Sequence, residues 1–383
     1  MIRYAALASA SLAFSQTPVA QEPVAMNPAP VPNPATTPAK GLQATGYLDF
    51  YFQTDFGQPR GRQPANGRGF DTTQGAFKLS AAQLDLSLAP TVKHPFGFWL
   101  TGLVGPEATL FAATEPAGID KYKDLAQAYV TYLAPTRFPL TFDFGKWYSF
   151  VGYEGIDNRV QDNYSRSLLF AGLEPGYMTG LRGCAVVSGK LTLNGYLYQG
   201  FNEVQNSNST LMSGLGATMA LTPALTATLQ GYYGKESSAA INQSGTFGGI
   251  GFPTPGESWV TQGNLVVTYQ PNPKDKFAVD ATQASATRKG DWSGIAAYYR
   301  RQIDGRNAVG IRVERAADPD GIRFLAGPLL LHSLTATYDY TVNKNLNLRF
   351  ELRHDLGDNP FFNADSGLAT HRTTFTFAQI VKF

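Results

Sequence analysis

Hydrophobic and polar residues alternate along most of the chain after residue 46, in segments of about ten residues. In the segment NLNLRFELRH, residues 345–354, Leu or Phe stands at every even position up to 352, and Asn, Arg or Glu stands at every odd one. A period of two places these two sets on opposite faces of an extended strand. Because the second face carries charges, it must be in contact with water.

Sixteen such segments are predicted to be strands. They cover approximately residues 44–53, 77–89, 96–105, 124–133, 139–146, 177–187, 190–204, 209–221, 224–234, 258–270, 275–287, 292–302, 307–316, 329–342, 345–356 and 371–383. The connections between them mostly alternate short and long. A β-sandwich has no reason to sort its loops in this way, whereas an outer-membrane barrel has short periplasmic turns and long outer loops. The predicted fold is therefore all-β, a transmembrane antiparallel up-and-down barrel of about 16 strands, with 14 or 18 also possible.

Composition agrees with this fold class. Charged residues make up 16% of the chain, well under the roughly 25% usual for soluble domains. Mean hydropathy is nonetheless slightly negative, at -0.18. Beyond the N-terminus no apolar run approaches the ~20 residues of a membrane-spanning helix. The sequence therefore excludes a helical membrane protein but not a barrel, whose lipid-facing residues alternate with polar ones.

The N-terminal 41 residues do not share the alternating pattern. Residues 1–15 hold one positive charge, an apolar stretch at 5–14 and small residues at Ala13 and Ser15. These features predict a Sec-type signal peptide cleaved after Ser15 or, alternatively, after Ala20; a short buried helix is the competing interpretation. Residues 16–41 are rich in proline and predict an extended, disordered periplasmic spacer. The barrel is then expected over 42–383.

The chain ends in an alternating segment, TTFTFAQIVKF. Phe375, Phe377, Val381 and Phe383 share one face, which only Gln379 interrupts. The pattern predicts a closing strand whose apolar face meets lipid and which pairs with residues 46–52, so that no sheet edge is left open.

Three tryptophans fall where a predicted strand meets an outer link. They are Trp147, Trp259 and Trp292. This placement is typical of the aromatic girdle at the lipid headgroups. The alternative for any one of them is an ordinary core aromatic.

The link at residues 147–176 is the longest and combines many apolar residues with five charged ones of particular interest. These are Glu154, Asp157, Arg159, Asp162 and Arg166. A loop with this much apolar surface is not expected to extend into water. We expect it to fold into the lumen, pack its apolar side on the wall and hold its charges at the narrowest point. The alternative is an outward fold, as a lid or an oligomer contact.

Charged residues on the strands supply the opposite side of this constriction. Strand parity places eleven of them inward, and six of these form the predicted lumen wall, namely Arg182, Arg312, Glu314, Arg349, Glu351 and Arg353. Residues 288–353 hold eleven Lys or Arg and seven Asp or Glu, whereas the loop has an excess of acidic residues. A basic wall opposite an acidic loop would produce a transverse field that orients dipolar solutes. Alternatively, the wall charges simply pair with their neighbours across the lumen.

Several short strings carry a family resemblance. They are GYLDFYF (46–52), NGRGFDT (66–72), AQAYVTYLAP (126–135), DFGKW (143–147) and NYSRSLLF (163–170). In this order they resemble the putative beta-barrel porin-2, or OmpL-like, family of bacterial outer-membrane proteins. The resemblance implies a porin-like channel without a defined substrate or catalytic set. Similarity to general porins also implies a constriction loop at 147–176 and a possible homotrimer, and the terminal Phe looks like the signal read by barrel-assembly machinery.

Enzymatic and nucleic-acid-binding functions have little support. His94, His332, His354 and His371 lie far apart and lack metal-ligand spacing, so no metal or cofactor is expected. No nucleophile elbow of the G-x-S-x-G type occurs. The net charge is only +2, with no basic stripe for nucleic acid.

The expected function is that of an outer-membrane porin that passes small hydrophilic solutes or ions by passive diffusion. Its expected partners are outer-membrane lipid and the barrel-assembly machinery. Two alternatives remain open: a non-conducting structural barrel, and a surface adhesin or enzyme on a barrel scaffold.

Overall fold

The computed structural model describes residues 41–57, 66–113, 115, 118–237 and 256–383. The predicted signal peptide and all but the last residue of the predicted spacer lie outside these residues. Within the described part of the chain, no helix is long and apolar enough to cross a membrane.

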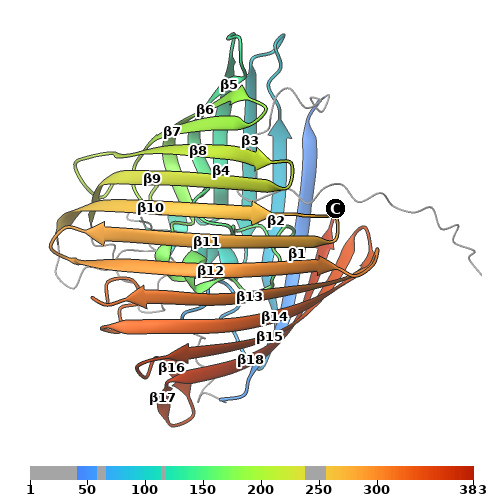
Figure 1. The fold of residues 1–383 in the computed structure, drawn as a ribbon, viewed down its shortest axis with the longest axis vertical. Coiled ribbons are helices and arrows are strands. Elements are labelled where there is room, and N and C mark those ends of the chain that lie inside the picture. Colours follow the sequence, from blue (N-terminus) through green and yellow to red (C-terminus); the bar gives the residue numbers. More distant parts are fainter. Residues whose placement is uncertain (1–40, 58–65, 114, 116–117, 238–255) are drawn as a thin grey trace, which may run out of the picture.

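Sixteen antiparallel strands form one closed barrel (Figure 1). They are β1 (Gln43–Asp55), β2 (Phe77–Leu88), β3 (Phe96–Val104), β4 (Leu125–Ala134), β5 (Leu140–Tyr148), β6 (Tyr177–Ser188), β7 (Leu191–Tyr198), β8 (Met212–Thr222), β9 (Leu225–Ser237), β10 (Glu257–Tyr269), β11 (Asp275–Ala286), β12 (Gly290–Gln302), β13 (Asn307–Asp318), β14 (Leu329–Asn343), β15 (Leu346–Gly357) and β18 (His371–Lys382). Each strand pairs with the barrel strand before and after it in the chain, and β18 closes the barrel on β1. The predicted fold and strand count are confirmed.

The largest difference from the predicted strands is at β7, which was expected over 190–204 and ends at Tyr198. Asn202 has a positive φ of 57°, which is incompatible with a continuing strand. Its side-chain oxygen instead accepts hydrogen bonds from the backbone N–H groups of Gly176 and Tyr177, at 2.7 and 3.1 Å. The chain beyond β7 therefore fixes the start of β6.

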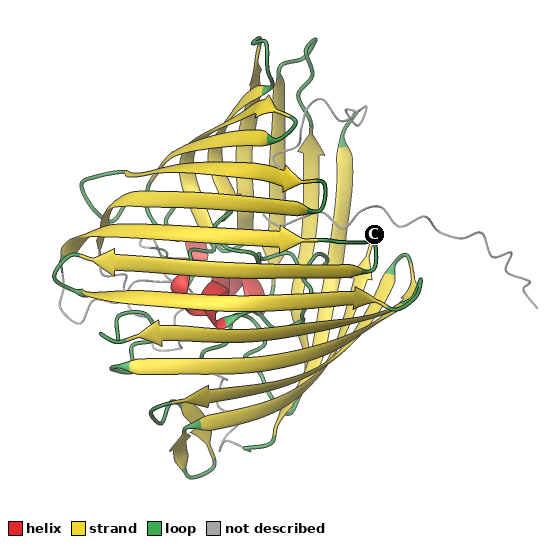
Figure 2. Cartoon of the chain, in the orientation of Figure 1, coloured by secondary structure: helices red, strands yellow, loops and turns green. Residues whose placement is uncertain are grey.

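The loops contain elements that the alternating pattern did not predict. They are two short helices, α1 (Pro106–Phe111) and α2 (Ile119–Tyr122), a π-helical turn η2 (Leu169–Leu173), and the hairpin of β16 (Phe362–Ala364) and β17 (Gly367–Ala369). Figure 2 shows the helical segments within the outline of the barrel.

The two faces of the barrel wall have opposite character. Inward residues such as Asp49, Asp85 and Asp143 are buried, whereas outward residues such as Phe144 (71% exposed) and Leu215 (75% exposed) face the surroundings. A soluble sheet would bury the apolar set, so this wall is built to meet lipid. The strands also define two ends, which we call the short-turn end, where the chain enters β1 and leaves β18, and the long-loop end.

The closing contact joins the start of β1 to the last residue of the chain. Gly46 and Phe383 exchange two backbone hydrogen bonds, at 2.9 and 3.1 Å. Gln379 stays on the outward face, opposite Phe50 of β1 and Leu348 of β15. The interruption in the apolar pattern therefore does not mark a register shift.

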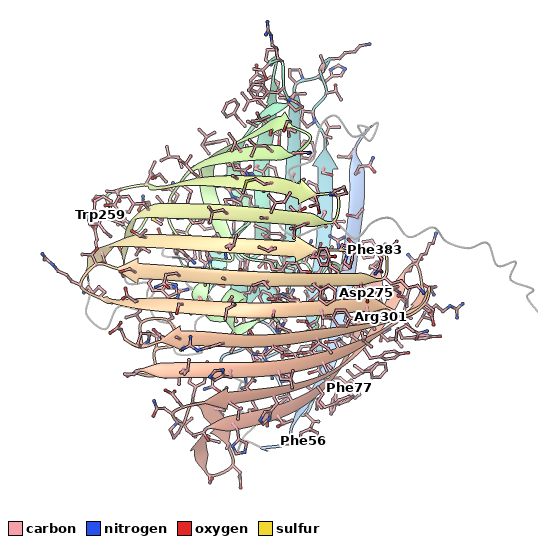
Figure 3. The ribbon with its side chains drawn as sticks, viewed as in Figure 1. Phe56, Phe77, Trp259, Asp275, Arg301 and Phe383 are labelled. Carbon is pink, nitrogen blue, oxygen red and sulfur yellow. The ribbon has the colours of Figure 1, made fainter. Side chains whose placement is uncertain are left out.

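The prediction of an aromatic girdle at Trp147 and Trp292 is wrong. Both side chains are buried inside the barrel, because Trp147 shares strand parity with inward Asp143, and Trp292 shares it with inward Arg300. Trp259 does face outward at the long-loop end, where it stacks on Tyr233 at 4.9 Å. In Figure 3, Trp259 and Phe383 lie at opposite ends of the barrel.

A row of outward aromatic residues lies at the short-turn end. Tyr269, Phe277 and Tyr299 occupy three neighbouring strands, and their ring centroids are 6.2 and 4.8 Å apart. Rings with a polar edge suit the membrane interface. The girdle predicted from tryptophan positions alone did not include this row.

Candidate functional site: the lumen and its loop

The chain between β5 and β6 lies inside the barrel. We call residues 149–176 the lumen loop. All of its residues from 161 onward are buried, and its backbone and side chains bond to inward residues of strands around the barrel. The loop of residues 147–176 therefore occupies the lumen rather than the outer surface.

Arg312 of β13 is one anchor of the lumen loop. Its Nη1 lies 2.7 Å from Glu154 Oε1 and also donates to the carbonyl of Ser165 at 2.6 Å. Its Nε donates to Glu314, two residues away on the same strand, at 2.9 Å. Because all these side chains are buried, the guanidinium balances two carboxylates that have lost their water.

Three side chains of β15 hold the backbone of the loop. Glu351 accepts hydrogen bonds from the N–H groups of Tyr164 and Ser165, at 2.7 and 3.1 Å. Arg353 donates to the carbonyl of Arg166, and Arg349 donates to that of Gln161, both at 2.7 Å. These inward wall residues therefore satisfy loop groups that water would otherwise solvate.

The loop also bonds to the remaining wall. Arg159 forms an ion pair with Asp85 of β2 at 2.6 Å, and Asn158 and the Tyr164 hydroxyl donate to Asp49 of β1. On the other side, the N–H of Tyr153 donates to Asp280 of β11 at 2.8 Å. The lumen loop therefore spans the cross-section of the barrel.

The five predicted constriction charges do not form one group. Glu154 and Arg166 are buried between the loop and the wall. Arg166 donates to the carbonyls of Gly155 and Tyr164, at 2.6 and 3.0 Å, so it stabilises the fold of the loop itself. Asp157 and Arg159 keep 22% and 18% of their side chains exposed.

Asp162 is the fifth charge and lies 2.8 Å from Lys276 of β11. Burial favours its protonated form, but Lys276 and Arg300 outweigh burial and hold the pKa of Asp162 below its ordinary value. At Glu174, burial, with Asp280 and Glu154 adding to it, raises the pKa well above the ordinary value, although Arg323 opposes the shift. The surroundings therefore favour the ionised form of Asp162 and the protonated form of Glu174.

The six predicted wall residues all face inward. The arginines make direct ion pairs, with Arg182 bonded to Asp143 at 2.7 Å, Arg349 to Asp339 at 2.8 Å and Arg353 to Asp355 at 2.7 Å. Glu351 instead accepts hydrogen bonds from the loop backbone. Local pairing, the alternative considered for these charges, therefore describes their contacts. The predicted transverse field required a gap between the acidic loop and the basic wall. At Arg312 and Glu154 there is no such gap, because the two side chains are in direct contact.

The lumen loop does not cover the whole wall equally. Every inward residue of β10 and β13 is buried. On the opposite wall, inward side chains of β4, β6, β7 and β8 remain partly exposed, and we call this set the open strip: Tyr129, Thr131, Arg182, Asn194 and Thr218. It lies toward the short-turn end of these strands.

Arg182 is the charged cation of the open strip, with 12% of its side chain exposed. Its guanidinium carbon lies 5.2 Å from the ring centroids of both Tyr129 and Trp147. Two aromatic faces and a carboxylate hold the group in a fixed position.

Toward the long-loop end, a cluster of buried aromatic side chains covers the inner face of the same wall. Phe150 of the loop stacks on Tyr196 of β7 at 4.0 Å, and Tyr198 and Tyr232 pack beside them. Because these four aromatic side chains are buried, the open strip ends at this cluster.

Amide side chains of the wall were missed as loop contacts. Asn264 of β10 bonds to the N–H of Gly152 and to Glu174, and Gln230 of β9 donates to the carbonyl of Phe150 at 2.7 Å. Their inward parity on β10 and β9 was the feature of the sequence that could have predicted these contacts. In the described residues, no group of three or more His, Cys, Asp or Glu is arranged to hold a metal ion.

A closed 16-stranded barrel with a polar interior, an apolar exterior and a loop folded into its lumen is the architecture of a porin. The chain belongs to the family described as putative beta-barrel porin-2, OmpL-like, whose model matches residues 41–383. Membership indicates a protein of the bacterial outer membrane.

Solved structures share the fold at low sequence identity. The anion-selective porin from Comamonas acidovorans is 12% identical, with a TM-score of 0.56 over 90% of this chain and 99% of that one. The outer membrane channel DcaP of Acinetobacter baumannii is 11% identical, with a TM-score of 0.57 over 89% and 97%. The trimer form of OmpT from Vibrio cholerae is 11% identical, with a TM-score of 0.56 over 90% and 99%. No curated protein matches the chain.

Proposed function

We propose that this protein is an outer-membrane porin through which small hydrophilic solutes and ions diffuse passively, along a lumen narrowed by the lumen loop. The observation that carries the proposal is the open strip, where inward Thr131, Arg182 and Asn194 stay in contact with water while the inward residues of β10 and β13 are buried. A barrel filled only for stability would have no reason to leave one polar wall wet.

The chemistry of the strip supports hydrophilic cargo. Hydroxyl, amide and guanidinium groups can replace part of the hydration of a passing hydrophilic solute, whereas an apolar solute has no polar group that could bond to them. Asp143 and Arg182 together leave the strip close to electrically neutral. Modest charge selectivity and a small conductance are therefore expected.

Conductance in planar bilayers tests the proposal. The wild-type protein is compared with a variant in which residues 155–166 are replaced by two glycines. The two flanking residues lie close together, because the Ser167 N–H donates to the Glu154 carboxylate at 2.6 Å. We expect small steps from the wild type and several-fold larger steps from the variant. Folding of each protein is verified by heat-modifiable gel migration. A folded variant with no conductance would contradict the channel, and an unchanged step size would show that solutes do not pass the loop.

A structural barrel that does not conduct is the second candidate. The aromatic cluster of Phe150, Tyr196 and Tyr232 favours it, because these buried rings close the wall above the open strip. The same experiment separates the two functions. Absence of steps from the folded wild type, with large steps from the loop variant, would identify a barrel plugged by its own loop.

We further propose that export by a Sec-type signal precedes recognition of the closing strand by barrel-assembly machinery. The outward row that ends at Phe383, 61% exposed, supports this. Assembly as a homotrimer is proposed from the resemblance to general porins. Light scattering of the folded protein in detergent measures the subunit number directly.

A further inference from the structure

Three of the chain's four histidines lie on the lipid-facing side of the barrel, close together. His332, His354 and His371 occupy outward positions of β14, β15 and β18, near the long-loop end. Arg315 of β13 lies directly opposite His332 across the strand pair. We call these four residues the basic patch.

The register of the strands defines the patch. Arg315 pairs with His332, His332 with Leu356, and Leu356 with His371, so that three basic residues share one row across four strands. His354 lies one step closer to the middle of the barrel wall, and its ring centroid is 6.4 Å from that of His371. Its Nδ1 is 2.7 Å from the Thr373 hydroxyl, which orients the ring.

One exposed acidic residue lies beside the patch: Asp358, just beyond the end of β15, whose carboxylate accepts a hydrogen bond from the N–H of Leu330 at 2.8 Å. The strands of the patch add no further acidic residue to this surface. Every residue of β13, β14, β15 and β18 is described, and the Asp and Glu residues of these strands, such as Glu314, Glu351 and Asp355, have inward parity and are buried. The outward residues beyond the patch toward the short-turn end are apolar, including Val313, Leu334 and Leu352. The patch is therefore a group of basic side chains at the long-loop edge of an apolar surface.

The patch differs in composition from neighbouring strands, although other basic residues lie at the long-loop end, namely Lys235 of β9, paired with Glu257 at 3.0 Å, and Arg288 in the turn between β11 and β12. At the same end of β11 and β12, outward positions carry Gln283, Ser285, Ser293 and Asp291, which are neutral or acidic. A general preference for polar residues at the membrane interface would not place Arg and three His on one side only. The difference indicates a specific ligand.

We propose that the basic patch binds the phosphate groups of an outer-leaflet lipid. The guanidinium group of Arg suits phosphate in a two-point contact, and imidazole donates a hydrogen bond from a ring N–H. The apolar rows beside the patch accept acyl chains, so a ligand that has both parts fits the whole surface. A free anion would contact only the basic side chains and not the apolar rows. The proposal is independent of whether the lumen conducts.

Native mass spectrometry of the folded full chain in detergent, titrated with lipid A as a bis-phosphorylated lipid, tests the proposal. The wild type is compared with a variant that combines Arg315→Gln, His332→Gln, His354→Gln and His371→Gln. The matched control combines His94→Gln with Arg301→Gln, which removes exposed basic groups at the short-turn end. We expect at least tenfold weaker lipid A binding by the patch variant and none of this loss in the control.

Three results would overturn the assignment. Equal binding by the wild type and the patch variant would show that the patch is not the site. Displacement of lipid A by inorganic phosphate at equal concentration would show a site for free anions. Conversion of a trimer to monomers by the patch variant, with lipid A affinity unchanged, would assign the surface to a second copy of the chain. The single variants Arg315→Gln and His371→Gln, each expected to weaken binding severalfold, give the same test if the combined variant does not fold.

Discussion

Arg312 of the wall and Glu154 of the lumen loop form a buried ion pair 2.7 Å long, between residues 158 positions apart in the chain. The same guanidinium also faces Glu314. The pair joins the part of the protein that meets lipid to the part that fills the lumen, so the position of the loop depends on it.

Replacing Arg312 with Gln should release the loop. The change leaves Glu154 buried without its cation and leaves Glu314 with only Arg353, 3.9 Å away. Removing one partner of a buried pair costs about 3–5 kcal/mol. Movement of the loop into water would relieve part of that cost. We therefore expect a larger single-channel conductance together with a lower free energy of unfolding, measured by urea titration in micelles.

Two further variants make this prediction specific. Arg301→Gln breaks the exposed pair with Asp275 at the short-turn end, 3.1 Å long and visible in Figure 3, and should change neither quantity. Combining Arg312→Gln with Glu154→Gln removes one of the stranded charges and should recover part of the stability. If the double variant is no more stable than the single one, the pair does not couple the loop to the wall.

Arg182 should set the charge preference of the open strip. Arg182→Gln leaves Asp143, which also accepts a hydrogen bond from Thr131 at 2.5 Å, without its cation. The strip then becomes net negative, and the reversal potential in a salt gradient should move toward cation preference. The shift in reversal potential should be smaller at high salt, because salt screens the charge of Asp143. Arg301→Gln is the control, because Arg301 lies on the outward face of β12 at the short-turn end, with 52% of its side chain exposed. An equal shift in both variants would place the solute path elsewhere.

The sequence was sufficient to predict the wall but not its contacts with the loop. Alternation identified all sixteen strands, and parity alone places Arg312 inward, because each strand reports its own two faces. The partner of Arg312 could not be found in this way, since no spacing relates it to Glu154 across 158 residues. Parity also places Trp147 with Asp143, and the girdle prediction failed because it used position along the strand instead. Helix α1 and the hairpin of β16 and β17 are too short to produce a periodic signal.

The stability of the folded protein should depend on pH through Glu107 of α1. Burial raises its pKa from 4.5 to about 8, even though Arg166 lies 3.9 Å away and opposes the shift; Asp49 and Asp157 add to it. Between these values the folded chain holds a proton that the unfolded chain has released. The free energy of unfolding should therefore fall as pH rises, by about 1.4 kcal/mol per pH unit for this one proton.

Glu107→Gln tests that dependence, because glutamine keeps the shape but cannot ionise. Urea unfolding in micelles at several pH values from about 5 to 8 should show a slope smaller by about one proton in the variant than in the wild type. Glu174 and Glu203, whose pKa values burial also raises, remain in both proteins and do not affect the difference. Identical slopes would mean that Glu107 is not protonated in the folded state.

Adding a single Cβ atom at Gly46 should impair closure of the barrel. A Cβ there would lie 2.5 Å from the backbone oxygen of Gln83 on β2 and 2.6 Å from the ring of Phe383. Gly46→Ala must therefore push β1 away from one of its two neighbours, at a cost of about 1–3 kcal/mol for overpacking. We expect a smaller fraction of heat-modifiable, folded protein after refolding.

Gly231→Ala is the matched control, because Gly231 is an outward strand glycine whose added Cβ would meet nothing within 4 Å. Adding Phe383→Ala to Gly46→Ala removes the ring but leaves the Gln83 oxygen, so it should restore the folded fraction only in part. This combination also separates closure from recognition by the assembly machinery, because refolding from urea into micelles proceeds without that machinery. If Gly46→Ala refolds as completely as Gly231→Ala, the two strands at the closing contact have room to separate, and Gly46 is not required for closure.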